Sequence, residues 1–292
     1  MTNGSMPSER IFGFSLLHAT YRAGDVALET RSVWLDRASE SARIEHIFAM
    51  DEDDELSVRI TANHRRVISP AWPGRVTAVR NWNAAAASSR GRILVAIADD
   101  LLPPDNWDAA LLEVIGDLDP LISPFVIKIG DSRSEESVLV RHPIVSFGHF
   151  DQFGFMPPSY TGVFVDNEFT LRTLQRALVL DGRNLAFTHV RQDTESQQAV
   201  NAVAEYDVGR SYWESRWSPQ RRWYLQRRYS LVQPIQASRV SDRSIAFQIG
   251  MKRALASIVI PLHIPRLWVH RSADLLQRLR STRDPAGASS DD

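Results

Sequence analysis

The stretch ILVAIADDLLPPDNWDAALLEVI, residues 93–115, decides the fold class of this 292-residue chain. It begins with an apolar run that has the length and composition of a buried strand. Two adjacent carboxylates, Asp99 and Asp100, follow at once, and two prolines then introduce a segment whose apolar residues have helical spacing. A buried strand that leads directly into a helix is typical of an α/β protein with a mostly parallel sheet.

The rest of the first half repeats this alternation. Short apolar runs predict strands, and amphipathic runs between them predict helices. A glycine is a natural helix stop, so the Ala-rich helix is expected to end at Gly91. The predicted strands cover residues 11–17, 44–50, 75–79, 93–98 and 125–129, and the predicted helices cover 24–39, 81–91 and 107–115, with a further helix beginning near Asp166.

The composition is that of an ordinary globular protein, with 43% hydrophobic and 24% charged residues. A net charge of −1 does not indicate nucleic-acid binding, so none is expected. The chain has no cysteine, so any metal must be held by oxygen or imidazole ligands. No apolar run approaches the ~20 residues that span a bilayer. The polar N-terminus lacks the apolar core of a signal peptide, so a cytoplasmic protein is expected.

Two acidic clusters follow predicted strands: residues 51–55 after one strand, and Asp99 with Asp100 after another. Ligands of parallel sheets bind beyond the carboxyl ends of the strands, so both clusters are expected at one edge. Adjacent carboxylates repel each other, and a Mg²⁺ or Mn²⁺ ion that also holds substrate phosphates offsets this repulsion. Each cluster taken alone is also consistent with a solvated acidic loop.

Four further residues are candidates for the site, and three of them have a simpler alternative. Arg80 and Asn83 precede the Asp99 strand and could contact phosphate or ribose, although Arg80 could equally be a surface arginine. Asp166 could remove a proton from an acceptor hydroxyl, or it could stabilise a helix N-terminus. His189 could be a third metal or diphosphate ligand, or a structural histidine.

In this order, the residues resemble the family 2 glycosyltransferases of GT-A fold over residues 10–195. The resemblance implies a GT-A type nucleotide-sugar-binding domain and transfer of a sugar, with inversion, from a UDP- or GDP-linked donor to a saccharide or lipid-linked acceptor. It implies a divalent cation, Mn²⁺ or Mg²⁺, and a role in cell-surface polysaccharide or glycoconjugate synthesis. The segments that carry it are HATYR (18–22), MDEDD (50–54), VRNWNAAAASSRG (79–91), IADDLLPPDNW (97–107) and FVDNEFTLR (164–172).

The resemblance also assigns roles to individual residues. The expected proton acceptor is Asp166, with Glu168 as a substitute. The expected metal ligands are Asp99, Asp100 and His189. The expected nucleotide-sugar-binding residues are Thr20, Tyr21, Arg22, Asp51, Asp53, Arg80, Asn83 and Asp99.

The chain departs from the family pattern at two positions. Ala98 stands where the Asp-X-Asp motif has its first carboxylate, and Val165 stands where many members carry Glu. Both departures keep open a noncatalytic nucleotide- or sugar-binding protein on a degenerate scaffold. A sugar nucleotidyltransferase is a second alternative, although the segment ATYRAGD (19–25) has one glycine and no lysine where that class needs a phosphate loop.

From Ser211 onward the chain is rich in Trp, Tyr and Arg. The spacing of Tyr212, Trp213 and Trp217 predicts a helix whose aromatic residues form core, and an aromatic surface for a sugar acceptor is the alternative. A further interpretation places this basic, apolar region on the inner face of a membrane as a peripheral contact. The expected division is a flexible N-terminus (1–9), a GT-A domain (10–210), a mainly helical extension (211–283) and a disordered tail (284–292).

Overall fold

The computed structural model describes residues 10–72, 77–131, 139–190 and 197–217. The predicted N-terminus (1–9), the predicted tail (284–292) and residues 218–283 of the predicted extension lie outside these ranges. The division into domains therefore stays a prediction, and helix α7 (Gln197–Arg216) runs continuously across residue 210, where the boundary is expected.

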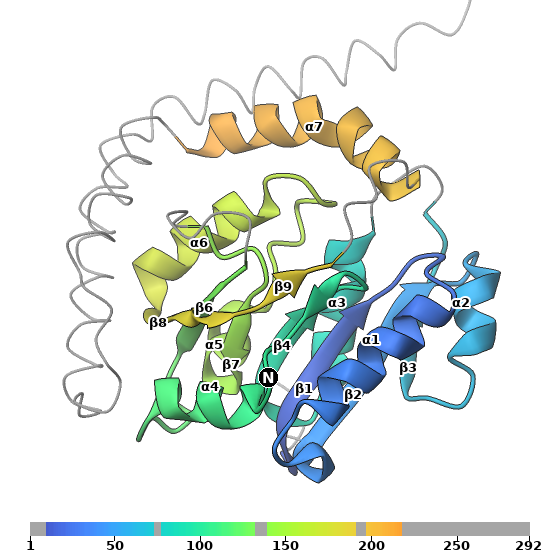
Figure 1. Cartoon of the computed structure of the whole chain (residues 1–292). Coiled ribbons are helices and arrows are strands. Elements are labelled where there is room, and N and C mark those ends of the chain that lie inside the picture. The colour runs from blue at the N-terminus through green and yellow to red at the C-terminus, as the bar shows by residue number, and fades with distance from the viewer. Residues whose placement is uncertain (1–9, 73–76, 132–138, 191–196, 218–292) are drawn as a thin grey trace, which may run out of the picture. The chain divides into compact units, whose positions relative to one another are not determined.

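The described residues form a seven-stranded central sheet with the strand order β3-β2-β1-β4-β7-β6-β8 (Figure 1). All strand pairs are parallel except the two that β7 makes with β4 and β6. The prediction of an α/β fold with a mostly parallel sheet is thus confirmed. The strands are β1 (Phe12–Ala19), β2 (Ile44–Asp51), β3 (Arg66–Ser69), β4 (Gly91–Ile97), β6 (Phe125–Gly130), β7 (Ile144–Ser146) and β8 (Leu178–Ala186), and β5 (Leu101–Leu102) pairs with β9 (Thr188–His189) in a separate small sheet.

The helices cover both faces of the sheet, as the alternation of side chains along the strands requires. Leu16 of β1 packs in one apolar cluster with residues of α1 and α4, and Leu17 packs in the other with residues of α3, α6 and α7. None of the helices in the described ranges is both long and apolar enough to cross a membrane. The helices are α1 (Asp25–Asp36), α2 (Glu55–Ile60), α3 (Ala78–Ser88), α4 (Trp107–Ile115), α5 (Phe147–Phe153), α6 (Val165–Arg176) and α7, with a 3₁₀ turn at Ser41–Arg43.

The strand predicted at 75–79 is wrong where the structure describes it. Ala78 and Val79 begin helix α3, and the third strand is β3, which lies earlier in the chain, between α2 and α3. Val79 and Ala86 are both fully buried on one side of α3, which is a helical spacing that the short sequence RVTAV hides. Gly91 does not stop that helix, which ends at Ser88; it is the first residue of β4.

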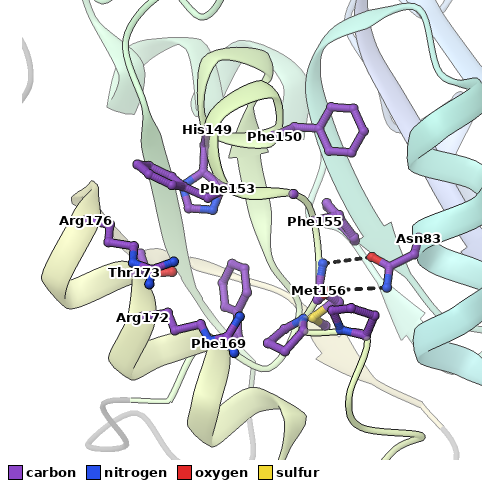
Figure 2. A pocket seen from close by; sticks show the side chains of 13 residues that line it. Asn83, His149, Phe150, Phe153, Phe155, Met156, Phe169, Arg172, Thr173 and Arg176 are labelled. Carbon is purple, nitrogen blue, oxygen red and sulfur yellow. Dashed lines mark hydrogen bonds between the residues drawn. The ribbon is translucent and has the colours of Figure 1, made fainter. Parts of the chain in front are cut away.

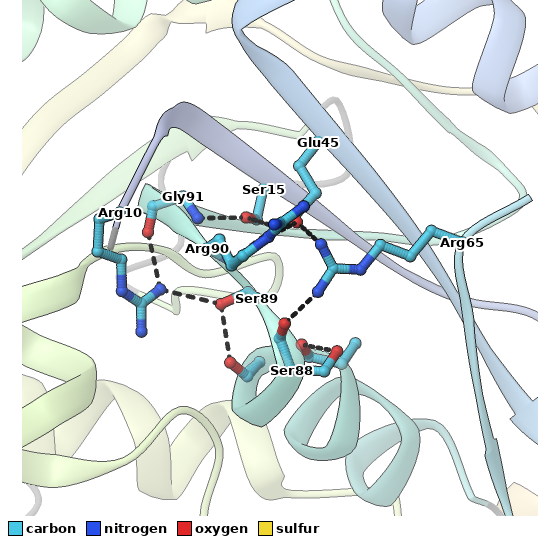
Figure 3. Close-up of polar contacts among 10 residues, drawn as sticks. Arg10, Ser15, Glu45, Arg65, Ser88, Ser89, Arg90 and Gly91 are labelled. Atoms are coloured by element: carbon cyan, nitrogen blue, oxygen red, sulfur yellow. Dashed lines mark hydrogen bonds and ion pairs between the residues drawn. The ribbon is translucent and has the colours of Figure 1, made fainter. Parts of the chain in front are cut away.

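Gly91 belongs to a polar cluster that ties the first strands together at their amino ends (Figure 3). A Cβ atom at Gly91 would lie 2.5 Å from the backbone nitrogen of Ser15, so the two strands approach too closely for any larger residue. Buried Glu45 accepts hydrogen bonds from Ser15 Oγ (2.5 Å) and from the backbone N–H of Arg90 (2.8 Å), and it pairs with Arg65. One carboxylate thus joins β2 to β1, to the entry of β4 and to the chain before β3.

We expect Glu45→Gln to lower the free energy of unfolding by about 1–3 kcal/mol, because Ser15, the Arg90 N–H and the partly exposed Arg65 would lose the buried charged group that they bind. Urea unfolding at neutral pH measures this. The matched control is Glu113→Gln, which changes an exposed glutamate on α4 and should have little effect. Equal stability of the two variants would show that the Glu45 cluster does not hold the strands together.

Candidate active site

The carboxyl ends of β1, β2 and β4 lie side by side, and they position most of the candidate residues. β1 is paired in parallel with both neighbours, so that His18 lies opposite Phe48 of β2 and Ile97 of β4. The chain continues from β2 through Asp51 and from β4 into Asp99. The expectation that both acidic clusters meet at one edge of the sheet is therefore confirmed by the strand order.

Asp99 has a fixed orientation at this edge. Its Oδ1 lies 2.9 Å from His18 Nε2, and its Oδ2 accepts a hydrogen bond of 3.1 Å from Thr20 Oγ1. Thr30 Oγ1 of α1 donates to the Asp99 carbonyl at 2.8 Å. The carboxylate keeps 24% of its surface exposed while His18 beneath it has none. Asp99 is thus a held carboxylate that a ligand can reach, not a residue of a solvated loop.

A second histidine supports His18 from below, and sequence reasoning missed both. His46 Nε2 lies 3.1 Å from His18 Nδ1, and His46 Nδ1 is buried with no hydrogen-bond partner among the described residues. Burial, His18, and the charges of neighbouring groups hold the pKa of His46 well below its usual value, so its ring is neutral. A neutral His46 with its proton on Nε2 donates to His18, which then donates from Nε2 to Asp99. This chain of donors fixes the orientation of the Asp99 carboxylate.

Asp100 points to a different partner. Its Oδ2 lies 3.3 Å from Nδ1 of His189, whose strand β9 pairs with β5 directly after the two carboxylates. The backbone N–H of Val190 donates to the Asp100 carbonyl at 2.9 Å. The structure therefore brings together the aspartate and the histidine expected to hold a metal. No three His, Cys, Asp or Glu residues of the described ranges are grouped closely enough to form a complete metal site.

Asp51 lies at the end of β2 with its side chain 4% exposed. Its Oδ1 accepts from Arg80 Nη2 at 2.7 Å and from Asn81 Nδ2 at 3.0 Å, and both donors are on α3. The Arg80 guanidinium also lies 5.5 Å from the centre of the Trp72 ring. Arg80 is thus tied to Asp51 and not a solvated surface arginine. Nucleotide binding by this pair stays a prediction, and Asn81 is a partner that sequence reasoning did not select.

The HATYR turn is held by an aspartate that sequence reasoning passed over. Asp54 Oδ2 accepts from the backbone N–H of Arg22 at 2.6 Å, and Asp54 Oδ1 caps α2 by accepting from Ser57 N at 3.1 Å. Arg22 has a φ of 52°, a strained conformation that this hydrogen bond stabilises. Asp53, the selected neighbour, is exposed. An aspartate directly before a helix is a preferred N-cap, which is the signal that identifies Asp54.

Tyr21 and Asn83 occupy different surroundings. Tyr21 is half-buried beside Arg22, whose guanidinium lies 5.1 Å from the centre of its ring. Asn83 is engaged elsewhere: its amide donates to the carbonyl of Met156 at 3.2 Å and accepts from the Met156 N–H at 2.8 Å. Asn83 therefore holds a neighbouring segment in place, and a nucleotide contact from it stays a prediction.

Glu168 is fully buried and joins α6 to α7. Its carboxylate accepts from Tyr160 Oη at 2.6 Å, from Arg216 Nε at 3.0 Å and from Trp217 Nε1 at 3.2 Å, and it pairs with Arg172. Burial alone would raise the pKa of Glu168, but these partners hold it below its usual value. A carboxylate so fully engaged is poorly suited to receive a substrate proton.

Asp166 is the other carboxylate expected to accept a proton, and this role stays a prediction. It lies in the first turn of α6 and accepts from the backbone N–H of Asn167 at 2.9 Å. Burial raises its pKa above the usual value, against the nearby charge of Arg141. Arg141 in turn bonds both oxygens of Asp131 at 2.9 and 2.8 Å, directly after β6. Since β7 is antiparallel to both β4 and β6, Asp131 lies at the same sheet edge as Asp99.

The aromatic residues at the C-terminal end of α7 belong to the core. Trp213 and Trp217 are 5% and 3% exposed and pack with residues of α6, while Tyr212 is only partly buried. The core interpretation of this helix is correct for the two tryptophans. The acceptor surface and the membrane contact concern residues that lie mostly outside the described ranges, and they stay predictions.

We expect the stability difference between the wild type and Glu168→Gln to depend on pH. A carboxyl whose folded pKa is lowered stabilises the protein above its unfolded value of 4.5 and loses this effect as the pH falls through the folded pKa. The variant should be about 3–5 kcal/mol less stable at neutral pH, with a smaller difference at acidic pH. Urea unfolding across this range measures both, and a difference that does not change with pH would contradict the assignment.

We expect His46 to stay neutral as the pH falls below 6.5, the usual pKa of histidine. Long-range ¹⁵N–¹H NMR should show a proton on Nε2 and a bare Nδ1, and free histidine in the same buffer is the reference. Protonation of both ring nitrogens near pH 6.5 would contradict the donor chain to Asp99.

No family model matches the sequence, and no curated protein does. Among solved structures, S. aureus TarS 1-349 in complex with UDP-GlcNAc has a TM-score of 0.50 and 11% identity, and the match covers 64% of this chain and 61% of that one. The mannosyltransferase PcManGT from Pyrobaculum calidifontis, in complex with GDP-Man and Mn²⁺, has a TM-score of 0.45 and 12% identity, with coverages of 94% and 88%. This chain therefore spans about three fifths of TarS 1-349. The likeness to TarS and the topology of the sheet agree that the chain has a GT-A type of fold.

Proposed function

We propose that this protein is a metal-dependent inverting glycosyltransferase that moves a sugar from a nucleoside-diphosphate sugar to an acceptor hydroxyl. The observation that carries the proposal is the meeting of Asp51, Asp99 and Asp100 at the carboxyl edge of the sheet, with His189 against Asp100. In open α/β sheets this edge is where ligands bind. The residues gathered there are of the kinds that recognise a ribose, a diphosphate and its cation.

The nucleoside would bind along β1, β2 and α3. Asp51 can accept hydrogen bonds from a base or ribose, and Arg80 beside it offers further donors and a face near Trp72. Asp99, held by His18 and Thr20, retains exposed carboxylate surface for a ribose hydroxyl. A UDP- or GDP-linked donor suits this arrangement, because both carry the same ribose and diphosphate.

The donor set fits a divalent cation. Asp100 and His189 supply oxygen and imidazole nitrogen, which suit Mn²⁺, and Asp99 adjoins them. Such ions commonly take one or two carboxylates from the protein and complete their coordination with substrate phosphates. A bound cation would neutralise the negative charge that builds on the leaving diphosphate.

Asp166 would act as the general base. Its carboxylate takes the proton of the acceptor hydroxyl while the hydroxyl oxygen forms a bond to the anomeric carbon. The bond from that carbon to the donor diphosphate breaks on the opposite side, and the nucleoside diphosphate leaves with the electron pair. Burial raises the pKa of Asp166, which brings this pKa closer to the operating pH and favours proton transfer. The proposed acceptor is a saccharide or a lipid-linked acceptor, consistent with a role in cell-surface polysaccharide or glycoconjugate synthesis.

We expect calorimetric titration to show binding of UDP or GDP that requires Mn²⁺ and is lost in Asp100→Ala. The matched control is Asp117→Ala, which changes an exposed aspartate after α4 and should bind as the wild type does. Binding that does not need the metal, or that survives in Asp100→Ala, would contradict the assigned metal site.

We expect Asp166→Asn to bind the nucleotide with unchanged affinity and to hydrolyse a nucleotide sugar about 10²–10⁴-fold more slowly in the absence of acceptor. Product release measured by chromatography follows this reaction. A wild type that binds the nucleotide tightly and releases no sugar would support the noncatalytic alternative. Unchanged hydrolysis in Asp166→Asn would remove Asp166 from the mechanism.

A further inference from the structure

A pocket of about 360 Å³ lies between helices α3, α5 and α6 and the segment that follows α5 (Figure 2). Its size is that of a site for a small organic molecule. Nearly all the residues that line it come from two short stretches, one in and after α5 and one in α6. They are Asn83, His149, Phe150, Phe153, Gly154, Phe155, Met156, Pro157, Pro158, Phe169, Arg172, Thr173 and Arg176.

This pocket is separate from the candidate active site. The N-cap of helix α5 is Ser146, whose hydroxyl accepts from the N–H of Phe125, the first residue of β6. The helix therefore starts at the amino edge of the sheet, opposite the edge that carries Asp99. Of the candidate site residues only Asn83 lines the pocket, and its amide is bonded to Met156 in both directions.

The walls of the pocket are aromatic. The imidazole of His149 stands edge-on to Phe153, with ring centres 5.3 Å apart and an angle of 71° between the ring planes. The same imidazole is 5.9 Å from the ring of Phe169 on α6, at 54°. Rings at such angles leave faces and edges against which a flat apolar molecule can pack.

Two buried polar atoms in these walls lack a hydrogen-bond partner among the described residues. They are His149 Nδ1 and Thr173 Oγ1, on side chains that are 3% and 1% exposed. Buried polar atoms are almost always paired, so two orphans in one pocket point to a polar group supplied by a ligand. Burial and the charge of Arg176 lower the pKa of His149 to about 3, so its ring offers one donor and one acceptor.

The charged side chains of the pocket are both arginines. Arg172 forms an ion pair with the carboxylate of Glu168. The Arg176 guanidinium lies 6.0 Å from the centre of the Phe153 ring. No carboxylate lines the pocket within the described residues. A bound molecule would therefore meet positive charge at Arg176 and apolar rings beside it. Guanidinium groups bind carboxylate and phosphate oxygens with two parallel hydrogen bonds.

We propose that this pocket binds a small aromatic anion, a flat apolar body that carries one carboxylate or phosphate group. The body packs against Phe153 and Phe169, a polar substituent pairs with His149 and Thr173, and the anionic group binds Arg176. This site goes beyond the proposed glycosyl transfer and does not depend on it, because it shares neither the Asp99 edge nor the nucleotide.

The fluorescent aromatic anion 1-anilinonaphthalene-8-sulfonate tests the site on the full-length protein. We expect it to bind and to be displaced by 2-naphthoate or 2-naphthyl phosphate, with the more effective of the two identifying the anionic group. The neutral 2-naphthalenemethanol should be about tenfold weaker, because it lacks the charge-assisted hydrogen bonds. Equal displacement by the neutral compound, or displacement by UDP, would overturn the proposal.

Two variants locate the probe. Arg176→Gln should weaken the anions about tenfold and leave the neutral compound unchanged. His149→Phe fills the same space without the orphan nitrogen. It should weaken 6-hydroxy-2-naphthoate, whose hydroxyl can pair with His149, and leave 2-naphthoate, which has no hydroxyl, unchanged, while the melting temperature stays close to that of the wild type. The matched control, Arg59→Gln, changes an exposed arginine on α2 and should bind as the wild type does. Wild-type affinity in both pocket variants would refute the site.

Discussion

The parallel pairing of β1 with β2 on one side and β4 on the other is the constraint on which the rest of the structure depends. Parallel strands end at the same edge, so this pairing brings Thr20, Asp51 and Asp99 together although long segments of chain separate them. It also stacks His18 directly under Asp99 and His46 beside His18. The order of the strands therefore determines which residues meet at the candidate site.

Buried carboxylates secure this arrangement at positions away from the site. Glu45 binds the amino ends of the strands together, and Glu168 binds α6 to α7. A buried charge is tolerated only when it is paired and hydrogen-bonded, and each of these two has four or more groups that satisfy it. The amino edge of the sheet is therefore held by the engaged carboxylate of Glu45, while Asp99 and Asp100 at the other edge keep exposed surface.

The adjacent pair Asp99 and Asp100 shows how two like charges are accommodated. Asp99 turns to His18 and Thr20 beneath the sheet edge, and Asp100 turns to His189 of the small second sheet. Each carboxylate has its own donors, so the repulsion between them is reduced before any ligand arrives. The exposed parts, 24% and 31% of the two side chains, are what a cation and a diphosphate could engage.

Local patterns in the sequence determined much of this architecture by themselves. Apolar runs and helical spacing are properties of neighbouring residues, so most strands and helices, the parallel sheet and the carboxylates at its edge could be predicted. The prediction of a strand at 75–79 is wrong because Val79 and Ala86 are buried together at a helical spacing, which extends beyond the short run RVTAV.

Partners of side chains, in contrast, were decided by the tertiary structure alone. His18 lies 81 residues from Asp99, and Asn83 lies 73 residues from the Met156 backbone that it holds. Two of the groups that bind Glu168, those of Arg216 and Trp217, come from the end of α7, 48 and 49 residues further along the chain. Such contacts depend on how distant elements pack, and packing distances are not encoded in any short stretch of the chain.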